Sequence, residues 1–259
     1  MKYRIVFLGA GNLAVRLSLA LKSAHFNVVQ VFNRSENPAK ELAKQLGAEF
    51  TTSPSGVIND ADIYMLALAD SAWDDVLPKV DFKNNLIVHS SGSMPLDALR
   101  PYSENIGVLY PLQTFSKQRR VSFYEIPVFV EANSARNEEM LFRIGQEISQ
   151  SVSHMDSEKR LFLHIAAVFS CNFVNHCYAL GEELLNSKDI PFDVLKPLID
   201  ETAKKVMEMS PHKAQTGPAV RFDENIIEKH LEALRDFPIA RELYNSISKS
   251  IFDHHQNKK

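Results

Sequence analysis

A glycine-rich turn near the start of the chain has the residue types and spacing that bind a pyrophosphate. The stretch "RIVFLGAGNLAVRLSLAL" passes from an apolar strand pattern into an amphipathic helix, with Gly9, Gly11 and Ala14 in the order G-x-G-x-x-A. Gly9 permits a tight turn, Gly11 leaves space for a phosphate, and Ala14 lets helix and strand pack closely. Amide groups near Asn12 and Leu13 would face the phosphates. We therefore predict dinucleotide binding; the alternative is an ordinary tight turn.

The end of the second predicted strand indicates which dinucleotide binds. The stretch "NVVQVFNRS" ends in Asn33, Arg34 and Ser35, where NAD-binding proteins commonly have a carboxylate that contacts the ribose 2′-hydroxyl and repels a 2′-phosphate. The guanidinium of Arg34 suits a phosphate or the face of adenine, and Ser35 adds a hydroxyl donor. The sequence thus predicts NADP(H). The alternative is that Arg34 is a solvated loop charge and Asn33 a turn former.

Two loops after later predicted strands carry side chains that can exchange protons. They are "HSSGS" (89–93) and "YPLQTF" (110–115), and ligands of open α/β sheets bind at this edge. We expect Tyr110 and Ser91 to be candidate proton donors and Ser90 a candidate substrate contact, with local loop capping as the alternative for His89 and Ser90. No G-x-S-x-G elbow is present, so a hydrolase is not expected. Ala69, after the strand "DIYMLALA", is small enough for its backbone to approach the cofactor, although packing alone also explains it.

A long helical segment places polar groups on a face that is otherwise apolar. In a regular α-helix, Val168, Cys171 and Asn175 lie within about 40° of His164, and Asn172 lies within about 80°. We predict His164 and Asn172 as candidate catalytic groups and Asn175 as a candidate substrate contact. The alternative for the histidine is a hydrogen-bonded core residue.

The loop "TGPAVRFDEN" supplies a candidate anion contact, Arg221. An ion pair with Asp223, which is placed to cap the following helix, is the alternative for this arginine. The chain has neither an HExxH motif nor paired Cys-x-x-Cys motifs, so we expect no metal site.

The order of predicted elements positions these candidates in two domains. Short apolar runs such as "YRIVFLG", "NLIVHSS" and "IPVFVEA" alternate with helical segments up to about residue 156, which predicts right-handed crossovers and a Rossmann-like, mostly parallel sheet. From Ser157 onward the pattern is helical throughout. We predict an NADP-binding domain over residues 1–156 and a helical substrate-binding and dimerisation domain over residues 157–259.

Composition excludes several classes of protein. The 259 residues are 45% apolar and 24% charged, as in an average globular protein, and the net charge of −3 gives no basis for binding nucleic acid. The chain passes from Met1 directly into a strand pattern, and its uninterrupted apolar runs are too short to span a bilayer. We expect a cytoplasmic protein without a membrane partner.

Several stretches together resemble a known family: "FLGAGNLA", "FNRS", "HSSGS", "YPLQTF" and "QTGPAVRFDENIIEKHLEAL". They are similar to bacterial NADP oxidoreductases that join a Rossmann-like domain to a helical domain of unknown function. More broadly, the chain resembles the superfamily of pyrroline-carboxylate reductase, β-hydroxyacid dehydrogenases, prephenate dehydrogenase and deazaflavin-dependent NADP reductases. The resemblance implies a helical domain like the C-terminal domain of 6-phosphogluconate dehydrogenase, and a homodimer formed through it.

The chain departs from that superfamily at two positions. The β-hydroxyacid dehydrogenases have a catalytic Lys one turn before an Asn in the long helix, whereas here Val168 and Cys171 precede Asn172 and Asn175. Related sequences often have His-Pro where this chain has Tyr110 and Pro111. The first hypothesis is an NADPH-dependent oxidoreductase that transfers a hydride to or from a small carbonyl, imine or related acceptor. The second is a protein that senses NADP(H) without turnover.

Overall fold

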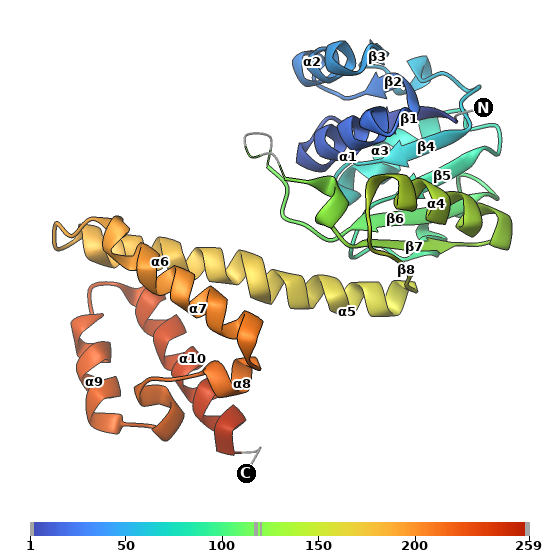
Figure 1. The fold of residues 1–259 in the computed structure, drawn as a ribbon. Coiled ribbons are helices and arrows are strands. Elements are labelled where there is room, and N and C mark those ends of the chain that lie inside the picture. Colours follow the sequence, from blue (N-terminus) through green and yellow to red (C-terminus); the bar gives the residue numbers. More distant parts are fainter. Residues whose placement is uncertain (1–2, 117–118, 120, 257–259) are drawn as a thin grey trace. The chain divides into compact units, whose positions relative to one another are not determined.

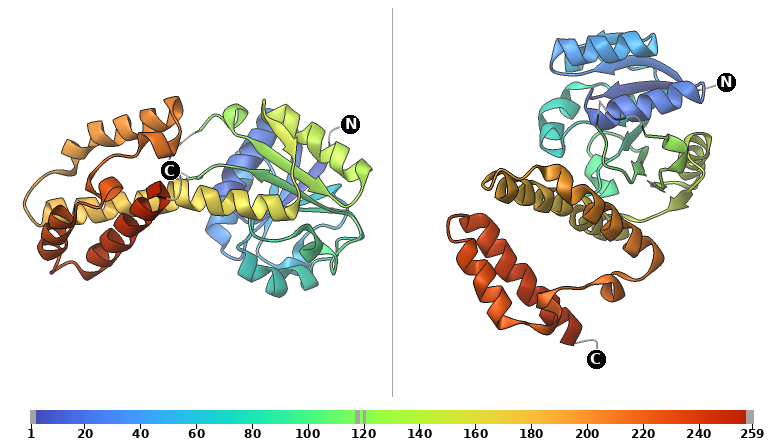
Figure 2. Two further views of the ribbon diagram at one scale, coloured as in Figure 1. Left: turned by 90° about the horizontal axis from the view of Figure 1, so that it is seen from below. Right: turned by 60° about the vertical axis from the view of Figure 1, so that its left-hand side comes forward.

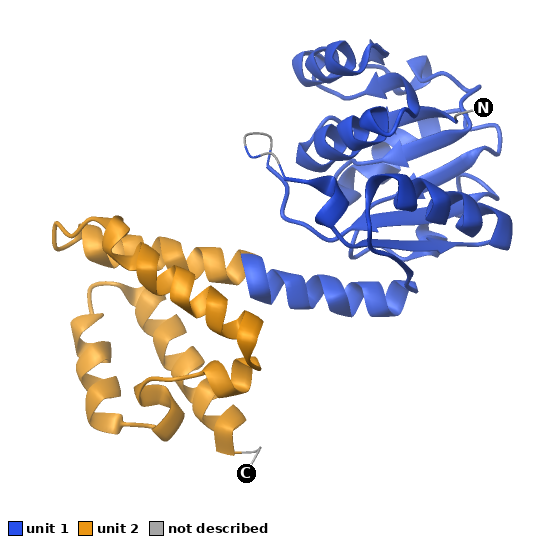
Figure 3. Cartoon of the chain, viewed as in Figure 1, with its two compact units in different colours: residues 1–171 blue, residues 172–259 orange. Residues whose placement is uncertain are grey.

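The computed structural model describes residues 3–116, 119 and 121–256. The chain forms two compact units, residues 1–171 and residues 172–259 (Figure 3). Their division falls inside the long helix, later than the boundary at 156/157 that the change of sequence pattern predicts. The reason is that the first turns of this helix pack on the sheet unit, where Arg160 is buried.

The first unit is built on one twisted sheet, and the Rossmann-like, mostly parallel architecture is confirmed (Figure 1). In the described residues the strands have the spatial order β3-β2-β1-β4-β5-β6-β7-β8, and among neighbouring strands β6 and β7 are antiparallel while the rest are parallel. The strands are β1 (Arg4–Leu8), β2 (Asn27–Phe32), β3 (Glu49–Thr51), β4 (Ile63–Leu66), β5 (Leu86–His89), β6 (Ile106–Pro111), β7 (Val128–Ala132) and β8 (Val152–His154). The sequence pattern did not predict β8.

Helices cover both faces of this sheet because its strand side chains are apolar on both faces. In β1, Ile5 and Phe7 belong to one buried cluster and Val6 and Leu8 to another, as expected for alternation along a strand. The first cluster includes side chains of the helices α1 (Asn12–Ser23), α2 (Glu36–Leu46) and α4 (Ala135–Ile148). In the ribbon of Figure 1, α1 and α4 lie in front of the sheet. The second includes the short α3 (Trp73–Val76). The sheet is therefore the rigid middle layer of the first unit.

The long helix begins as α5 (Ser157–Ala167), in which the Asp156 side chain accepts a hydrogen bond from the Lys159 amide and so caps the helix. A π-helical segment, Val168–Phe173, then joins α5 to α6 (Val174–Asn186). The stripe predicted from His164 to Asn175 assumed regular α-helical spacing. Because hydrogen bonds in a π-helix run from i to i+5, that spacing is wrong beyond residue 167.

The second unit consists of helices and connecting turns in the part of the chain that the structure describes. After α6 come α7 (Lys196–Glu208), α8 (Pro211–Ala214), α9 (Glu224–Ala233) and α10 (Pro238–Gln256), and the last two lie side by side (Figure 2). Large apolar side chains are exposed on this unit, among them Phe173, Leu198 and Met207. Within the described residues, the helical run Ser157–Asn186 is long and apolar enough to cross a membrane by length and composition alone. The sequence prediction considered uninterrupted apolar runs, so it identified this helix but not its length and hydropathy as sufficient to span a bilayer.

Candidate active site

The turn after β1 is held tightly by the backbone around it. Gly9 has φ +119°, a conformation that side chains disfavour, and its N–H donates a hydrogen bond of 2.7 Å to the carbonyl of Phe32. A Cβ atom at Gly9 would lie 2.4 Å from the carbonyl oxygen of Ala67, at the end of β4. The turn therefore requires glycine at this position for both conformation and space.

The beginning of α1 is open where the turn meets it. Gly11 is the N-cap residue and makes no side-chain cap, and a Cβ atom there would meet nothing within 4 Å. Within α1, Ala14 is buried and Asn12 is exposed. The first amide groups of a helix have no partner within the helix, so they are available to an anion in this open space. These residues fit a dinucleotide pyrophosphate.

The end of β2 presents the side chains expected for a 2′-phosphate. The Nδ2 atom of Asn33 donates to the carbonyl of Ser35 at 3.0 Å, and the Asn33 amide donates to the carbonyl of Thr51, so Asn33 shapes the turn. Arg34 and Ser35 are exposed, and the Ser35 hydroxyl makes no cap for α2. Their polar groups are thus presented to solvent. Ala69, the remaining predicted cofactor contact, is exposed after β4.

Tyr110 and His164 meet at the carboxyl edge of the sheet, at the end of β6 and away from the cofactor residues that follow β1 and β2. Tyr110 is at the end of β6 and 7% exposed, and its Oη atom lies 3.1 Å from the Nδ1 atom of His164 in α5. Gly92 packs against this histidine so closely that a Cβ atom would lie 2.5 Å from His164 Cγ. Burial raises the pKa of Tyr110, and the positive charge of Arg160 lowers it in part. The structure therefore brings two sequence candidates together in one hydrogen-bonded pair.

His89, at the end of β5, is a buried and neutral residue. Its side chain is 0% exposed, its ring contacts that of Trp73, and its Nδ1 atom accepts a hydrogen bond of 3.1 Å from the Ser91 amide. Burial, followed by the charge of Arg160, lowers the pKa of His89 to about 3, although the carbonyl of Pro95 acts in the opposite direction. Because it is buried and neutral, His89 supports the loop after β5.

Ser91 has a loop-capping role that the sequence did not predict for it. Its hydroxyl donates to the Asp70 carboxylate at 2.9 Å and accepts from the amides of Ser93 and Met94 at 3.1 Å each. These bonds order the turn between β5 and the following segment. Ser90 is buried beside it. The hydroxyl of Ser91 is thus occupied within the loop, which weakens its candidacy as a proton donor.

Arg160 was missed by the sequence reasoning. It is 1% exposed, and its guanidinium donates to the Glu131 carboxylate, to the carbonyl of Met94 at 2.7 Å and to the Ser157 hydroxyl at 3.1 Å. In the sequence "SEKRLFLH" it looks like one charge of a solvated first helical turn. Its spacing of four residues from His164, which places both on one helix face, was the available signal.

The remaining candidates belong to the second unit. Asn172 and Asn175 are exposed, and their predicted roles stay predictions. The side chain of Arg221 is 72% exposed, with one nitrogen 3.9 Å from the Asp223 carboxylate. Asp223 accepts from the Ile226 amide at 3.4 Å and so caps α9, as predicted. The pairing of Arg221 with Asp223 is loose, and the predicted anion contact of Arg221 stays a prediction.

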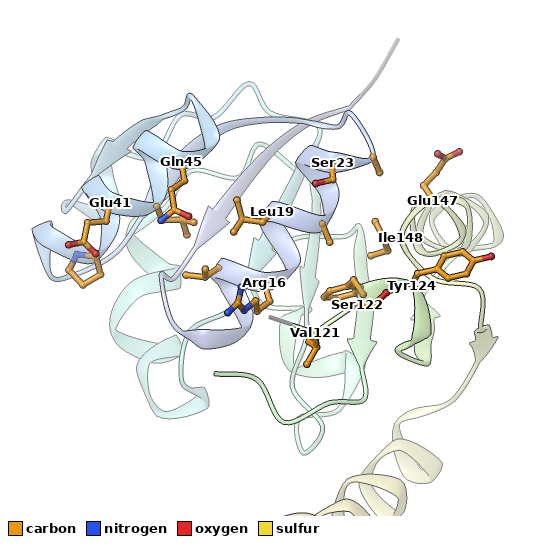
Figure 4. A pocket seen from close by; sticks show the side chains of 16 residues that line it. Arg16, Leu19, Ser23, Glu41, Gln45, Val121, Ser122, Tyr124, Glu147 and Ile148 are labelled. Atoms are coloured by element: carbon orange, nitrogen blue, oxygen red, sulfur yellow. The ribbon is translucent and has the colours of Figure 1, made fainter. Parts of the chain in front are cut away.

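A separate hollow lies on the helical face of the first unit (Figure 4). Its volume is about 850 Å³, and it is lined by residues of α1, α2, α4 and the segment 121–124. Arg16, on its wall, donates to the carbonyl of Ser116 at 3.0 Å. Among the described residues, those that line this hollow include no predicted site residue, so it is a different surface from the carboxyl edge.

Comparison with known proteins finds relatives along nearly the whole chain. Residues 4–91 match a family described as NADP oxidoreductase coenzyme F420-dependent, and residues 126–251 match a domain of unknown function (DUF2520). A protein from Bacteroides fragilis, whose assignment as an NADP oxidoreductase is provisional, is 46% identical with a TM-score of 0.92. That alignment covers 97% of this chain and 98% of the other. No curated protein matches the chain.

More distant structures share the fold. An imine reductase from Myxococcus stipitatus in complex with NADP+ is 16% identical, with a TM-score of 0.67 over 98% of this chain and 93% of that one. A 1-pyrroline-5-carboxylate reductase from Streptococcus pyogenes is 15% identical, with a TM-score of 0.65 over 97% of this chain and 99% of that one. At such identities the similarity establishes the architecture alone.

Proposed function

The chain belongs to the family of NADP oxidoreductases that join these two domains, and from that premise we propose that it transfers a hydride between NADP(H) and a small carbonyl or imine compound. The observation that carries this proposal is the contact of 3.1 Å between Tyr110 and His164. It provides a buried proton donor at the carboxyl edge of the sheet, where ligands of such folds bind.

The residues that would hold the cofactor are those of the first turn and of the end of β2. The amides near Asn12 and Leu13 would bind the pyrophosphate, and Arg34 and Ser35 would bind the 2′-phosphate. When bound, NADPH supplies a hydride to an electrophilic carbon. The open space over Gly11 and the exposure of Arg34 support this assignment.

Reduction of a carbonyl or imine also requires a proton on the oxygen or nitrogen, and Tyr110 is the group that we assign to this step. Burial keeps the phenol protonated by raising its pKa, so the hydroxyl is available as a donor. A free phenolate would be unfavourable in the same environment. We therefore assign His164, in its imidazolium form, the transfer of its Nδ1 proton to the Tyr110 oxygen as that oxygen gives its own proton to the substrate. The transfer leaves a neutral phenol and a neutral imidazole, and the imidazole takes up a proton from solvent before the next turnover.

The substrate class follows from the same pair. A neutral phenol can protonate an alkoxide or a developing amine without a metal ligand or a nucleophilic residue. Two distant relatives of this fold are named as imine and pyrroline-carboxylate reductases, which favours imines within the proposed class. In the helical unit, Asn172 stays a proposed catalytic group, and Asn175 and Arg221 stay proposed substrate contacts.

We further propose that the helical unit takes a second copy of the chain as its partner. Leu198 is 62% exposed and Met207 is 85% exposed on α7, and Phe173 is 50% exposed at the beginning of α6. Exposed apolar side chains of this size are typical of a surface that another protein covers. Light scattering of the purified chain tests the proposal: a mass of two chains supports it, and a monomer at micromolar concentration contradicts it.

The proposed reaction is tested by screening cyclic imines, keto acids, aldehydes and deazaflavins for NADPH oxidation. For an accepted substrate, Tyr110→Phe and His164→Ala should each lower kcat by about 10²- to 10⁴-fold while the dissociation constant of NADPH stays unchanged. Tyr124→Phe is the matched control, because Tyr124 is 61% exposed and lines the separate hollow of Figure 4. Full activity in Tyr110→Phe would contradict the assignment of the proton donor.

A further inference from the structure

A buried ion pair lies at the base of α5, and the proton-donating pair does not include it. Arg160 is 1% exposed, and the side chain of its partner Glu131, on β7, is 18% exposed. Buried ion pairs contribute little net stability in general, because desolvation offsets their attraction. Stability alone is therefore a poor explanation for placing this pair inside the first unit.

The hydrogen bonds of Arg160 join three segments that are distant in sequence. The guanidinium binds Glu131 on β7 and the carbonyl of Met94 in the loop after β5. Ser157 completes the network, because its hydroxyl donates to Glu131 at 2.8 Å and accepts from the Leu96 amide at 2.9 Å. The first turn of α5 is thus fixed to a strand and to the loop that carries Gly92.

This network determines where His164 can lie. His164 follows Arg160 by four residues, so both side chains project from one face of α5. Its ring is packed against Gly92, in the loop that Arg160 holds through Met94. The position of α5 and the position of that loop therefore both depend on the same guanidinium.

We propose that Arg160 is a positioning residue for the reductase, which acts through His164 by holding α5 and the 92–96 loop so that His164 Nδ1 meets the Tyr110 hydroxyl. This inference rests on the proposed function for its effect on turnover, but its geometric part is independent of turnover. His164 contacts Tyr110 directly, and the charge of Arg160, which is paired with Glu131 on β7, lowers the pKa of Tyr110. The same charge lowers the pKa of His89 on β5.

The experiment compares two ion pairs of the same chemistry in one domain. The double variant Glu131→Gln with Arg160→Gln removes both charges together, so neither charge remains buried alone. The matched control is Glu139→Gln with Arg143→Gln on α4, where the side chains are 65% and 73% exposed. Circular dichroism and the dissociation constant of NADPH establish that each variant is folded.

Two measurements follow in the full chain. The ¹⁵N resonances of the His164 imidazole report whether Nδ1 is hydrogen-bonded, and Tyr110→Phe supplies the reference spectrum without that bond. We expect the Glu131/Arg160 double variant to give the Tyr110→Phe spectrum and to lose at least tenfold in kcat with an unchanged KM for NADPH. The Glu139/Arg143 control should resemble the wild type in both.

A folded Glu131/Arg160 variant with the wild-type His164 spectrum would overturn the inference. If this variant does not fold, Arg160→Lys, which keeps a cation opposite Glu131 but has no planar fork, is measured in the same way. A wild-type spectrum in that variant would also overturn it, and a shift towards the Tyr110→Phe spectrum would support it. Failure of the proposed function can be told apart from failure of this inference. If the proposed function is wrong, the wild type shows no turnover, but the His164 spectra still report whether Arg160 positions the imidazole.

Discussion

The cofactor turn and the Tyr110–His164 pair lie at the same edge of one sheet, yet they are built in different ways. The cofactor turn is made by backbone groups, since Gly9 donates to the carbonyl of Phe32 and nearly touches that of Ala67. The Tyr110–His164 pair is made by side chains that are 54 residues apart in sequence. A site made by the backbone depends on which residues lack a side chain, whereas a site made by side chains depends on the packing of distant segments.

The largest effect is expected from breaking the backbone-built region with Gly9→Val. The new side chain would have to accept φ +119° and a carbonyl oxygen 2.4 Å from its Cβ, which should cost about 3 kcal/mol or more and remove NADPH binding. Gly47→Val is the control for backbone conformation, because Gly47 has φ +74° with nothing near its Cβ. Urea unfolding measures the loss of stability, and NADPH titration measures the loss of binding. Retained NADPH affinity in Gly9→Val would contradict the assignment of the turn.

The second effect is a pH dependence of stability that His89 gives to the side-chain-built region and that the cofactor turn lacks. His89 has a pKa of about 3 in the folded protein against 6.5 as its ordinary value. Between these two pH values the imidazole is protonated in the unfolded chain and neutral in the folded chain, which favours unfolding. This residue makes no difference to stability above pH 6.5, and stability is lost as the pH falls from there towards 3. Relative to His89→Asn, which can still accept from the Ser91 amide, the wild type should lose about 2–3 kcal/mol between pH 7 and pH 4.5.

Urea unfolding at both pH values measures this difference. The cofactor turn has no titrating side chain at Gly9, Ala10 or Gly11, so Gly11→Ala, whose Cβ would meet nothing within 4 Å, should follow the wild type in its pH dependence. Parallel pH dependence in the wild type and His89→Asn would show that the histidine is not buried in the neutral form.

Gly92→Ala sharpens the comparison within the side-chain-built region. Its Cβ would lie 2.5 Å from His164 Cγ, so the imidazole must move from Tyr110. We expect a loss in kcat of about tenfold, or about 1.4 kcal/mol, with no change in NADPH affinity. Gly181→Ala is the control, since its Cβ would make ordinary contact with Leu195 at 3.6 Å. An unchanged kcat in Gly92→Ala would mean that the position of His164 does not matter.

The smallest effect is expected for Ser91→Ala. Its hydroxyl bonds order the loop after β5, so their removal should cost about 1 kcal/mol of stability. We expect kcat to change less than about threefold, because a capping hydroxyl does not transfer the proton. Steady-state kinetics with the substrate found by screening measures this. A loss as large as that of Tyr110→Phe would restore Ser91 as the proton donor.

The fold and the cofactor turn were largely predictable because their signals are local. Glycine spacing and short apolar runs identify the turn and the first seven strands, whereas β8 has three residues that include Ser153 and His154 and gives no such signal. Tyr110 and His164 were each predicted as candidates, but only tertiary packing brings them together. Arg160 was missed because its burial depends on Glu131 in a distant strand. The π-helical segment after Ala167 displaced the predicted stripe, since simple periodicity assumes a regular helix.

One pair of measurements tests the central claim that the two regions divide binding from chemistry. The dissociation constant of NADPH and the single-turnover rate of its oxidation are determined for Arg34→Glu and Tyr110→Phe. The account predicts that Arg34→Glu weakens NADPH binding by tenfold or more and keeps the rate at saturation, because only the 2′-phosphate contact is lost. It predicts that Tyr110→Phe keeps the affinity and loses the rate by at least a hundredfold. Equal changes of affinity and rate in both variants would contradict it.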